Sequence, residues 1–234
     1  MTRAMDTPPL SIVIPARNAA VTLAAVLAAL DEGHRCGLIG EILVADGGST
    51  DDTVRRAQAA GAVVLSAPAG RGPQLAAGAA AAAGDWLLFL HADTRLAPGW
   101  AAGVAAFIAD PANRTRAAVF RLQLDDADPR ARRIERLARW RGRVLGLPYG
   151  DQGLLISARF YGGLGGYRLL PLMEDVDFVR RIGRRRLVHL AVPALTSAAR
   201  YRSGGWWLRP LRNLSILTLY FLGAPPRLLH RLYG

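Results

Sequence analysis

The sequence contains no lysine, so its 30 basic residues of the Lys and Arg class are all arginines. It contains one cysteine, Cys36. A single cysteine excludes a fold stapled by internal disulfides and fits a reducing compartment. Residues 1–10 lack a charged segment followed by a long apolar run, so no secretory signal is indicated. With 234 residues, 51% of them hydrophobic, the chain is long enough to bury a core without disulfides. We therefore expect a globular cytoplasmic protein rather than a fibrous or disordered one.

Acidic residues are scarce relative to arginine in the second half of the chain. Residues 1–100 hold nine acids and seven arginines, whereas residues 101–234 hold nine acids and 23 arginines, so the net charge of +12 divides into −2 and +14. A basic half attracts anions, and nucleic acid, an anionic membrane surface and a phosphorylated substrate are all candidates. Charge alone does not choose among them.

The first 90 residues alternate between short apolar runs and segments of helical composition. Apolar runs predict strands at residues 10–14, 42–45, 62–65 and 86–90, and helices are predicted between them at 19–30, 51–60 and 74–83. This order predicts an α/β fold with a mostly parallel sheet covered by helices. Beyond residue 95 the pattern weakens, and we expect strands at 117–124 and 153–157 and helices at 129–145 and 174–182.

Polar clusters follow each of the four predicted strands, in segments 15–18, 46–51, 69–72 and 91–94. In open α/β sheets the ligand crevice lies beyond the carboxyl ends of the strands. Asp46 and its following glycines could meet a base or ribose, and Gly70-Arg71-Gly72 offers a cation and backbone N–H groups to a diphosphate. Ordinary turns and helix caps explain both motifs equally well when each is taken alone.

Asp93 follows a fully apolar predicted strand, where a carboxylate without a partner is costly. A divalent cation shared with substrate phosphates would satisfy it, and an imidazole ligand from His91 would favour Mn2+. Asp151, Glu174, Asp175 and Asp177 are acids within the basic half. They fit structural ion pairs, helix-dipole partners or a general base that takes a proton from an attacking hydroxyl.

Five motifs occur in the order seen in family 2 glycosyltransferases, which the chain resembles from about residue 9 to 190. They are Ser11-Ile-Val-Ile-Pro-Ala-Arg-Asn18, residues 41–53 with Asp46-Gly-Gly-Ser-Thr-Asp51, residues 84–93 ending in His91-Ala-Asp93, Gly162-Gly-Leu-Gly-Gly-Tyr167 and Glu174-Asp-Val-Asp-Phe178. The Gly70-Arg-Gly-Pro-Gln74 and His-Ala-Asp-Thr forms look like those of a bacterial subgroup of small, single-domain members.

The resemblance implies a GT-A fold, a UDP- or GDP-linked sugar donor, a divalent cation (Mn2+ or Mg2+) and inversion at the anomeric carbon. Carried over by position, it implies Asp175 as base with Glu174 beside it, and Asp93 with His91 at the metal. Donor contacts are expected from Pro15, Ala16, Asn18, Asp46, Gly48, Arg71, Gln74 and Ala92, and the acceptor side from Tyr149, Gly150, Asp151 and Gln152. Histidine stands where the family usually has the first acid of its metal motif, which leaves the number of direct ligands open.

We expect a GT-A domain at residues 1–200, with a nucleotide-sugar half at about 9–95 and an acceptor half at about 96–200, and a helical, basic and apolar extension at 201–234. The apolar run at 214–223 is too short to span a bilayer, which takes on the order of 20 residues. It would suit an interfacial segment near an anionic membrane and a lipid-linked acceptor, a hairpin docked on the domain, or a homodimer contact.

Two other functions compete with the enzyme. The missing first acid of the metal motif would suit a nucleotide-sugar-binding protein without transferase activity. A basic nucleic-acid-binding module is the weaker alternative, because no helix-turn-helix, zinc or RNP-type pattern accompanies the arginines, so no nucleic acid is expected as a partner.

Overall fold

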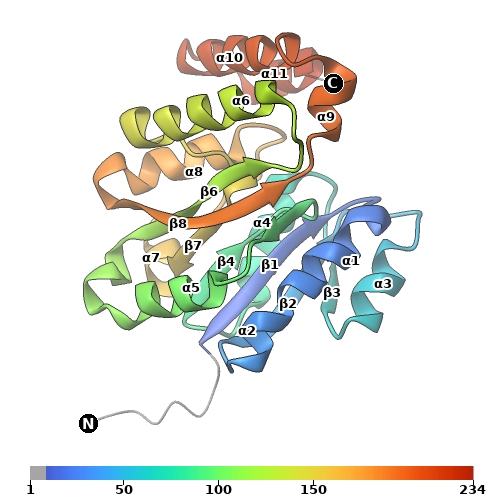
Figure 1. The fold of residues 1–234 in the computed structure, drawn as a ribbon, viewed down its shortest axis with the longest axis vertical. Coiled ribbons are helices and arrows are strands. Elements are labelled where there is room, and N and C mark those ends of the chain that lie inside the picture. The colour runs from blue at the N-terminus through green and yellow to red at the C-terminus, as the bar shows by residue number, and fades with distance from the viewer. Residues whose placement is uncertain (1–8, 234) are drawn as a thin grey trace.

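The computed structural model describes residues 9–233, and one eight-stranded sheet organises them (Figure 1). The strands are β1 Leu10–Ala16, β2 Ile39–Asp46, β3 Val63–Ser66, β4 Trp86–Phe89, β5 Thr94–Leu96, β6 Ala117–Leu124, β7 Leu154–Ser157 and β8 Leu187–Thr196. Their order is β3-β2-β1-β4-β7-β6-β8-β5. The first four are parallel, β7 is antiparallel to β4 and β6, β8 is parallel to β6, and β5 is antiparallel to β8. The predicted mostly parallel α/β fold is confirmed.

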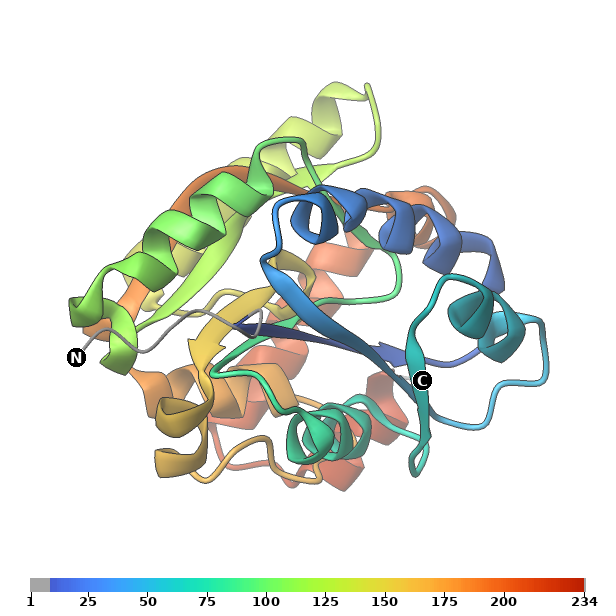
Figure 2. The same ribbon diagram turned by 90° about the horizontal axis from the view of Figure 1, so that it is seen from below.

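Helices cover both faces of this sheet, as Figures 1 and 2 show from two directions. They are α1 Ala20–Ala29, α2 Asp31–Arg35, α3 Thr53–Ala59, α4 Arg71–Ala81, α5 Trp100–Ala109, α6 Pro129–Trp140, α7 Ala158–Gly163, α8 Glu174–Ile182, α9 Ala199–Gly204, α10 Leu208–Phe221 and α11 Pro226–Tyr233. A π-helical turn at Arg141–Leu145 extends α6, and 3-10 turns occupy Pro111–Thr115, Gly150–Gln152 and Arg184–Arg186.

Two apolar cores result from the alternation of side chains along the strands. Ile12 and Ile14 of β1 face α1 and α5 in one core, whereas Val13 faces α4 and α8 in the other. Strands buried on both faces read as uninterrupted apolar runs, which is why β1, β2 and β4 were visible in the sequence.

Several elements differ from the sequence prediction. Helix α4 begins at Arg71 rather than at residue 74, so Arg71 lies in its first turn. Strands β5 and β8 and helices α5 and α7 were not predicted. β5 has three residues, and β8 contains Pro193 beside a register shift against β6, so neither carries a regular apolar pattern.

Helices α10 and α11 pack on the rest of the protein through Ile216, Leu217 and Leu229, which belong to the core that contains α4 and α8. One face of the helical hairpin formed by α10 and α11 is thus docked on the domain, as one of the alternatives for the C-terminal extension predicts. Within residues 9–233 no helix is both long and apolar enough to cross a membrane. The division at residue 200 and the cytoplasmic location stay predictions, and the segment inspected for a secretory signal lies almost entirely outside the described residues.

Candidate functional site

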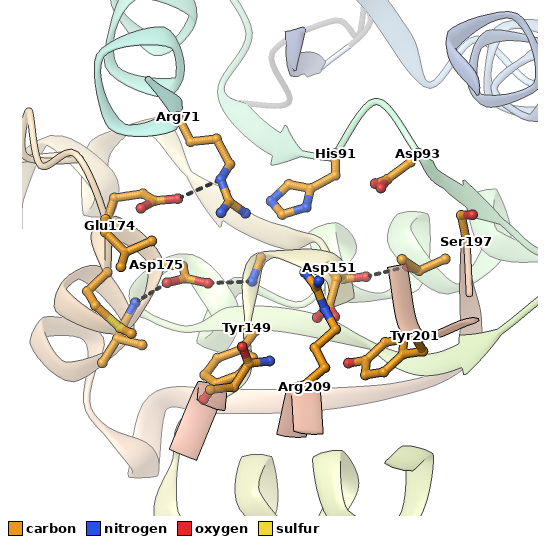
Figure 3. Close-up of a pocket in the computed structure, with 16 residues that line it drawn as sticks. Arg71, His91, Asp93, Tyr149, Asp151, Glu174, Asp175, Ser197, Tyr201 and Arg209 are labelled. Carbon is orange, nitrogen blue, oxygen red and sulfur yellow. Dashed lines mark hydrogen bonds and ion pairs between the residues drawn. The ribbon is translucent and has the colours of Figure 1, made fainter. Parts of the chain in front are cut away.

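Two cavities meet at the carboxyl ends of β1 and β4, where the sequence places its polar loops. The first, of about 110 Å³, is called the acidic cavity because Asp93, Asp151, Glu174 and Asp175 line it. The second, of about 410 Å³, is called the loop cavity, and its lining includes Pro15, Ala16, Arg17, Asn18, Gln74 and Ala92. Arg71, His91, Asp93 and Ser197 line both. The predicted donor and catalytic groups therefore converge on one continuous site (Figure 3).

Hydrogen bonds between the loop after β1 and the loop after β2 fix the shape of the loop cavity. The Thr50 N–H donates to Oδ1 of Asn18 at 2.8 Å, and the Asn18 N–H donates to Oγ of Ser49 at 2.9 Å. Asn18 has a φ of 50°, in the left-handed region that asparagine tolerates better than most side chains. This residue therefore ties the loop after β1 to the loop after β2.

Asp46 and Gln74 act on the backbone of these loops. Oδ2 of Asp46 accepts hydrogen bonds from the N–H groups of Gly48 and Ser49 at 3.1 and 3.0 Å. The Gln74 side-chain amide donates to the carbonyls of Ala16 and Ala45 at 2.7 and 2.8 Å. Asp46 and Gly48 do not line either cavity. The structure thus gives Asp46 and Gln74 a role in shaping the loops, and the expected base contact of Asp46 stays a prediction.

Arg71 points from α4 towards Glu174 at the start of α8, with 3.3 Å between its Nε and Oε1 of Glu174. A Cβ atom on the neighbouring Gly72 would lie 2.6 Å from the carbonyl oxygen of Arg168. Only glycine lets the first turn of α4 approach the segment before α8 this closely. The glycine-rich motif at 70–72 thus lets the Arg71 guanidinium approach the Glu174 carboxylate of α8, a helix far away in the sequence.

Glu174 is almost completely buried. Burial, followed by the nearby Asp175 carboxylate, raises the pKa of Glu174 to about 7, although Arg71 works in the opposite direction. A carboxyl group with this pKa exchanges its proton near neutral pH. The preceding Met173 has a φ of 66°, and such backbone strain is typical of functional sites.

Two backbone donors fix the orientation of Asp175. Its Oδ2 accepts from the Gly150 N–H at 2.9 Å and its Oδ1 accepts from the Val176 N–H at 2.7 Å. A Cβ atom on Gly150 would lie 2.5 Å from Nε2 of His91, so the Gly150 backbone packs directly on the imidazole. Gly150 therefore couples the position of the predicted base to that of a predicted metal ligand.

Asp151 contributes a fourth carboxylate to the acidic cavity, and its Oδ1 is buried without a hydrogen-bond partner among the described residues. Burial raises its pKa to about 6; Arg141 lowers it, and the charges of Asp175 and Asp93 raise it further. Tyr149 and Gly150 also line this cavity. Gln152 does not: it is buried, and its side-chain amide donates to the Phe120 carbonyl at 3.0 Å. Its Oε1 is buried without a hydrogen-bond partner among the described residues, and its acceptor-side role stays a prediction.

Asp93 and His91 fit a divalent cation when phosphate oxygens complete its ligands. Across residues 9–233 no group of three His, Cys, Asp or Glu side chains is arranged to hold a metal ion. Mg2+ and Mn2+ sites in nucleotide-binding proteins commonly use one or two protein ligands together with substrate phosphates. The pair lies where both cavities meet, beside Arg71, which is where a bound diphosphate would supply those oxygens.

Three residues of the C-terminal helices line the site without a role predicted from the sequence. Tyr201 of α9 and Arg209 and Asn213 of α10 line the acidic cavity. Figure 3 shows Tyr201 and Arg209 across from Arg71 and His91. Arg209 and Asn213 are four residues apart, on the helix face that also carries the buried Ile216 and Leu217. The signal that could have found them in the sequence is a pair of polar residues on a helix face that otherwise carries apolar side chains.

The comparisons with known proteins agree with this architecture. A glucosyl-3-phosphoglycerate synthase of Mycobacterium tuberculosis is 37% identical over 93 residues, which cover 36% of this chain and 28% of that protein. The match thus spans less than a third of the curated relative's length. A structure of the M. tuberculosis synthase with Mn2+, UDP-glucose and phosphoglyceric acid has a TM-score of 0.61 and 21% identity, covering 92% of this chain and 80% of the other.

S. aureus TarS, residues 1–349, has a TM-score of 0.60 at 14% identity, covering 90% of this chain and 65% of the other. These likenesses show the GT-A fold. The model of glycosyl transferase family 2 matches residues 11–171, more than half of the sequence. The region it covers supplies Asn18, Arg71, His91, Asp93 and Asp151, and it ends just before α8. The chain belongs to glycosyl transferase family 2.

Proposed function

We propose that the protein transfers a hexosyl group from a UDP-sugar to an acceptor hydroxyl, with a divalent cation and with inversion at the anomeric carbon. The synthase with the same fold has been solved with Mn2+ and UDP-glucose, and also with Mg2+ and UDP. The observation that carries the proposal is the sharing of Arg71, His91 and Asp93 by two cavities. A diphosphate at this junction would place the nucleotide in the loop cavity and the sugar towards the acidic cavity.

Asp175 is the base in this proposal. It lines the acidic cavity but not the loop cavity, which puts it on the acceptor side of the junction. Its carboxylate would take the proton of the acceptor hydroxyl as that oxygen bonds to the anomeric carbon. The bond from the anomeric carbon to the phosphate oxygen breaks on the opposite face, and the nucleoside diphosphate leaves with the electron pair. Attack from the face opposite to the leaving group inverts the configuration.

Arg71 and Asp93 serve the leaving group. A bound Mn2+ or Mg2+ supplies positive charge to the departing diphosphate. Asp93, with His91 beside it, would hold this ion, and the Arg71 guanidinium would contact the phosphate oxygens from α4. Glu174, held 3.3 Å from Arg71, would position the guanidinium and, when protonated, donate a hydrogen bond to a substrate hydroxyl.

Donor binding is tested by thermal shift with UDP, GDP and dTDP sugars, each with EDTA, Mg2+ or Mn2+. We expect stabilisation by UDP-sugars that requires the metal and that Asp93→Ala reduces to the EDTA level. Asp125→Ala is the matched control, because Asp125 is exposed and pairs with Arg95 away from both cavities. Stabilisation of Asp93→Ala equal to that of the wild type would contradict the metal role.

The acceptor is the second part of the proposal, and we favour a lipid-linked or membrane-proximal hydroxyl compound handled at the cytoplasmic face of the membrane. The acidic cavity opens between the catalytic loops and α9 and α10, the helices of the apolar C-terminal extension. Incubation of a bacterial membrane extract with labelled UDP-glucose should move label into the organic phase after butanol extraction. Label that enters only the aqueous phase would contradict a lipid-linked acceptor without affecting the donor assignment.

A nucleotide-sugar-binding protein without transferase activity is the alternative, favoured by the presence of just two candidate protein ligands for the cation, Asp93 and His91, at the junction of the cavities. Release of UDP from UDP-glucose, by transfer or by slow hydrolysis, separates the two. Metal-dependent binding without any release would favour the binding protein.

A further inference from the structure

The outer face of α10 is unusually apolar for a surface that contacts water. Leu208, Leu211, Leu214 and Leu222 recur on one side of the helix with exposed fractions of 71%, 59%, 57% and 78%. Nine of the sixteen large apolar side chains that are exposed within residues 9–233 lie between residues 207 and 232. Exposed apolar patches of this kind mark interaction surfaces. We call the exposed side chains of α10 and α11, from Leu208 to Leu232, the outer C-terminal face.

The hydroxyl groups of Ser215 and Thr218 on this face already donate hydrogen bonds within their own helix. The hydroxyl of Ser215 donates to the Leu211 carbonyl at 3.0 Å, and the hydroxyl of Thr218 donates to the Leu214 carbonyl at 2.9 Å. Both residues are exposed. Moving this face into an apolar environment would therefore leave neither hydroxyl donor without a partner.

The segment of chain that carries this face has charged residues of one sign. No Asp or Glu follows Asp177, whereas eleven arginines lie between residues 178 and 234. Arg212 of α10 and Arg227 and Arg231 of α11 are exposed beside the leucines. Trp207, 63% exposed, lies at the start of α10 with the Arg133 guanidinium 5.9 Å from its ring centroid. Leucines flanked by arginines and an interfacial tryptophan are typical of helices that lie on an anionic bilayer.

We propose that the outer C-terminal face docks on an anionic phospholipid membrane, with α10 and α11 in the interface. A second copy of this chain would bring two arginine-rich faces together without an acid to neutralise them, so like charges oppose that contact. The 14 residues of α10 extend about 21 Å, short of the roughly 30 Å hydrocarbon core. The helix would thus lie along the surface.

This docking would place the substrate site at the bilayer. Arg209 and Asn213 line the acidic cavity from the inner face of α10, whereas the leucines occupy its outer face. One helix is therefore a wall of the cavity and a part of the membrane contact. The docking rests on the proposed function insofar as it explains a membrane-proximal acceptor. The observations that support the docking come from the outer C-terminal face alone.

Co-sedimentation with vesicles tests the docking on the full chain. Wild type should bind vesicles of phosphatidylglycerol and phosphatidylcholine, bind pure phosphatidylcholine vesicles much less, and lose affinity as NaCl is raised. Leu211→Gln/Leu222→Gln should lower the partition coefficient at least about tenfold. Val21→Gln/Leu169→Gln is the matched control, because Val21 and Leu169 are 91% and 72% exposed on other surfaces. It should bind as the wild type does.

Each result decides the proposal. Wild type that stays in the supernatant with anionic vesicles at low salt would overturn it, and so would equal losses in the two double variants. A dimer in sedimentation velocity that Leu211→Gln/Leu222→Gln dissolves would assign the face to a second copy instead. Circular dichroism confirms that the variants are folded. Metal-dependent stabilisation by UDP is scored separately, so loss of docking and failure of the donor site are distinguished.

Discussion

The loop cavity and the acidic cavity share Arg71, His91 and Asp93 but are built from different interactions. Hydrogen bonds made by Asn18 and Gln74, together with the Asp46 carboxylate that accepts from two backbone N–H groups, hold the loops of the loop cavity in place. The acidic cavity instead gathers four carboxylates, and in two of them, Asp151 and Glu174, burial and neighbouring carboxylates raise the pKa. Loops held by hydrogen bonds suit the binding of a substrate, whereas crowded carboxylates suit the movement of a proton.

The two cavities also draw on different parts of the chain. The loop cavity is lined mainly by residues 15–93, with Ser197 and Ala199 added at its edge. The acidic cavity needs α8, α9 and α10, which follow the region matched by the family model. The loop cavity therefore lies largely within the region that the family model matches, whereas the acidic cavity also draws on helices beyond it.

The largest effect is expected from a substitution that removes the proposed base, Asp175, and leaves the loop cavity intact. Asp175→Asn should lower the rate of sugar transfer about 10²- to 10⁴-fold, because the amide cannot take the acceptor proton. It also turns an NH2 group towards one of the two N–H donors of Gly150 and Val176. Release of UDP from UDP-glucose, with and without acceptor extract, measures the loss.

The control for Asp175→Asn is Asp125→Asn, which removes an exposed carboxylate paired with Arg95. It should leave the rate unchanged. Stabilisation by UDP and Mn2+ should survive in both variants because Asp175 is not part of the loop cavity. More than half of the wild-type rate in Asp175→Asn would remove it from the mechanism.

The raised pKa of Glu174 predicts that the protein loses stability as the pH rises. A carboxyl group whose pKa is lowered on folding would have the opposite effect. Because its pKa is about 7 in the folded protein and 4.5 as the reference value, folding favours the protonated form. The stability from this group is complete below pH 4.5 and is lost as the pH rises through about 7. Glu174 should therefore account for a loss of up to about 3 kcal/mol between pH 5 and 8, to which the raised pKa of Asp151 adds a further loss.

Glu174→Gln should lose much less over the same range, because glutamine carries no proton to release. Urea unfolding at pH 5 and pH 8 measures the difference, and Asp125→Asn should follow the wild type. An identical change in Glu174→Gln and wild type would show that this carboxyl group does not titrate as its burial requires.

Much of the site could be predicted because its main residues follow apolar strands or open helices. Asp93 follows β4, Arg71 opens an alanine-rich helix, and Glu174 and Asp175 begin an amphipathic one. Their convergence at one sheet edge follows from parallel topology. Arg209 and Asn213 could not be placed this way, because they line one cavity with Arg71 although more than 130 residues of chain separate them, and no local pattern encodes that proximity. Gln152 lies beside cavity residues, yet its 3-10 turn points it at the Phe120 carbonyl.

The contact between Gly150 and His91 is a mechanical link within the acidic cavity. Gly150→Ala would place a Cβ atom 2.5 Å from Nε2 of His91, so the imidazole or the Asp175 anchor must move. A displacement of this size should lower the transfer rate about tenfold and weaken stabilisation by Mn2+ with UDP. Gly162→Ala is the matched control, because its new methyl group meets no atom within 4 Å. Equal rates for the two variants would show that the imidazole position is unimportant.

The smallest effects are expected at Asn18, where two substitutions separate backbone strain from hydrogen bonding in the loop cavity. Both Asn18→Ala and Asn18→Gly remove the acceptor of the Thr50 N–H, but only alanine is strained at a φ of 50°. Alanine should cost about 1–2 kcal/mol of unfolding free energy, and glycine less by up to about 1 kcal/mol. Both should weaken UDP binding, since the side-chain hydrogen bond between two loops of the cavity is lost in each and only the backbone bond to Ser49 remains. If glycine and alanine lowered stability equally, the left-handed backbone would carry no strain. If UDP binding were unchanged in both, the hydrogen bonds between loops would not be what shapes the donor side, and the contrast between the two cavities would fail.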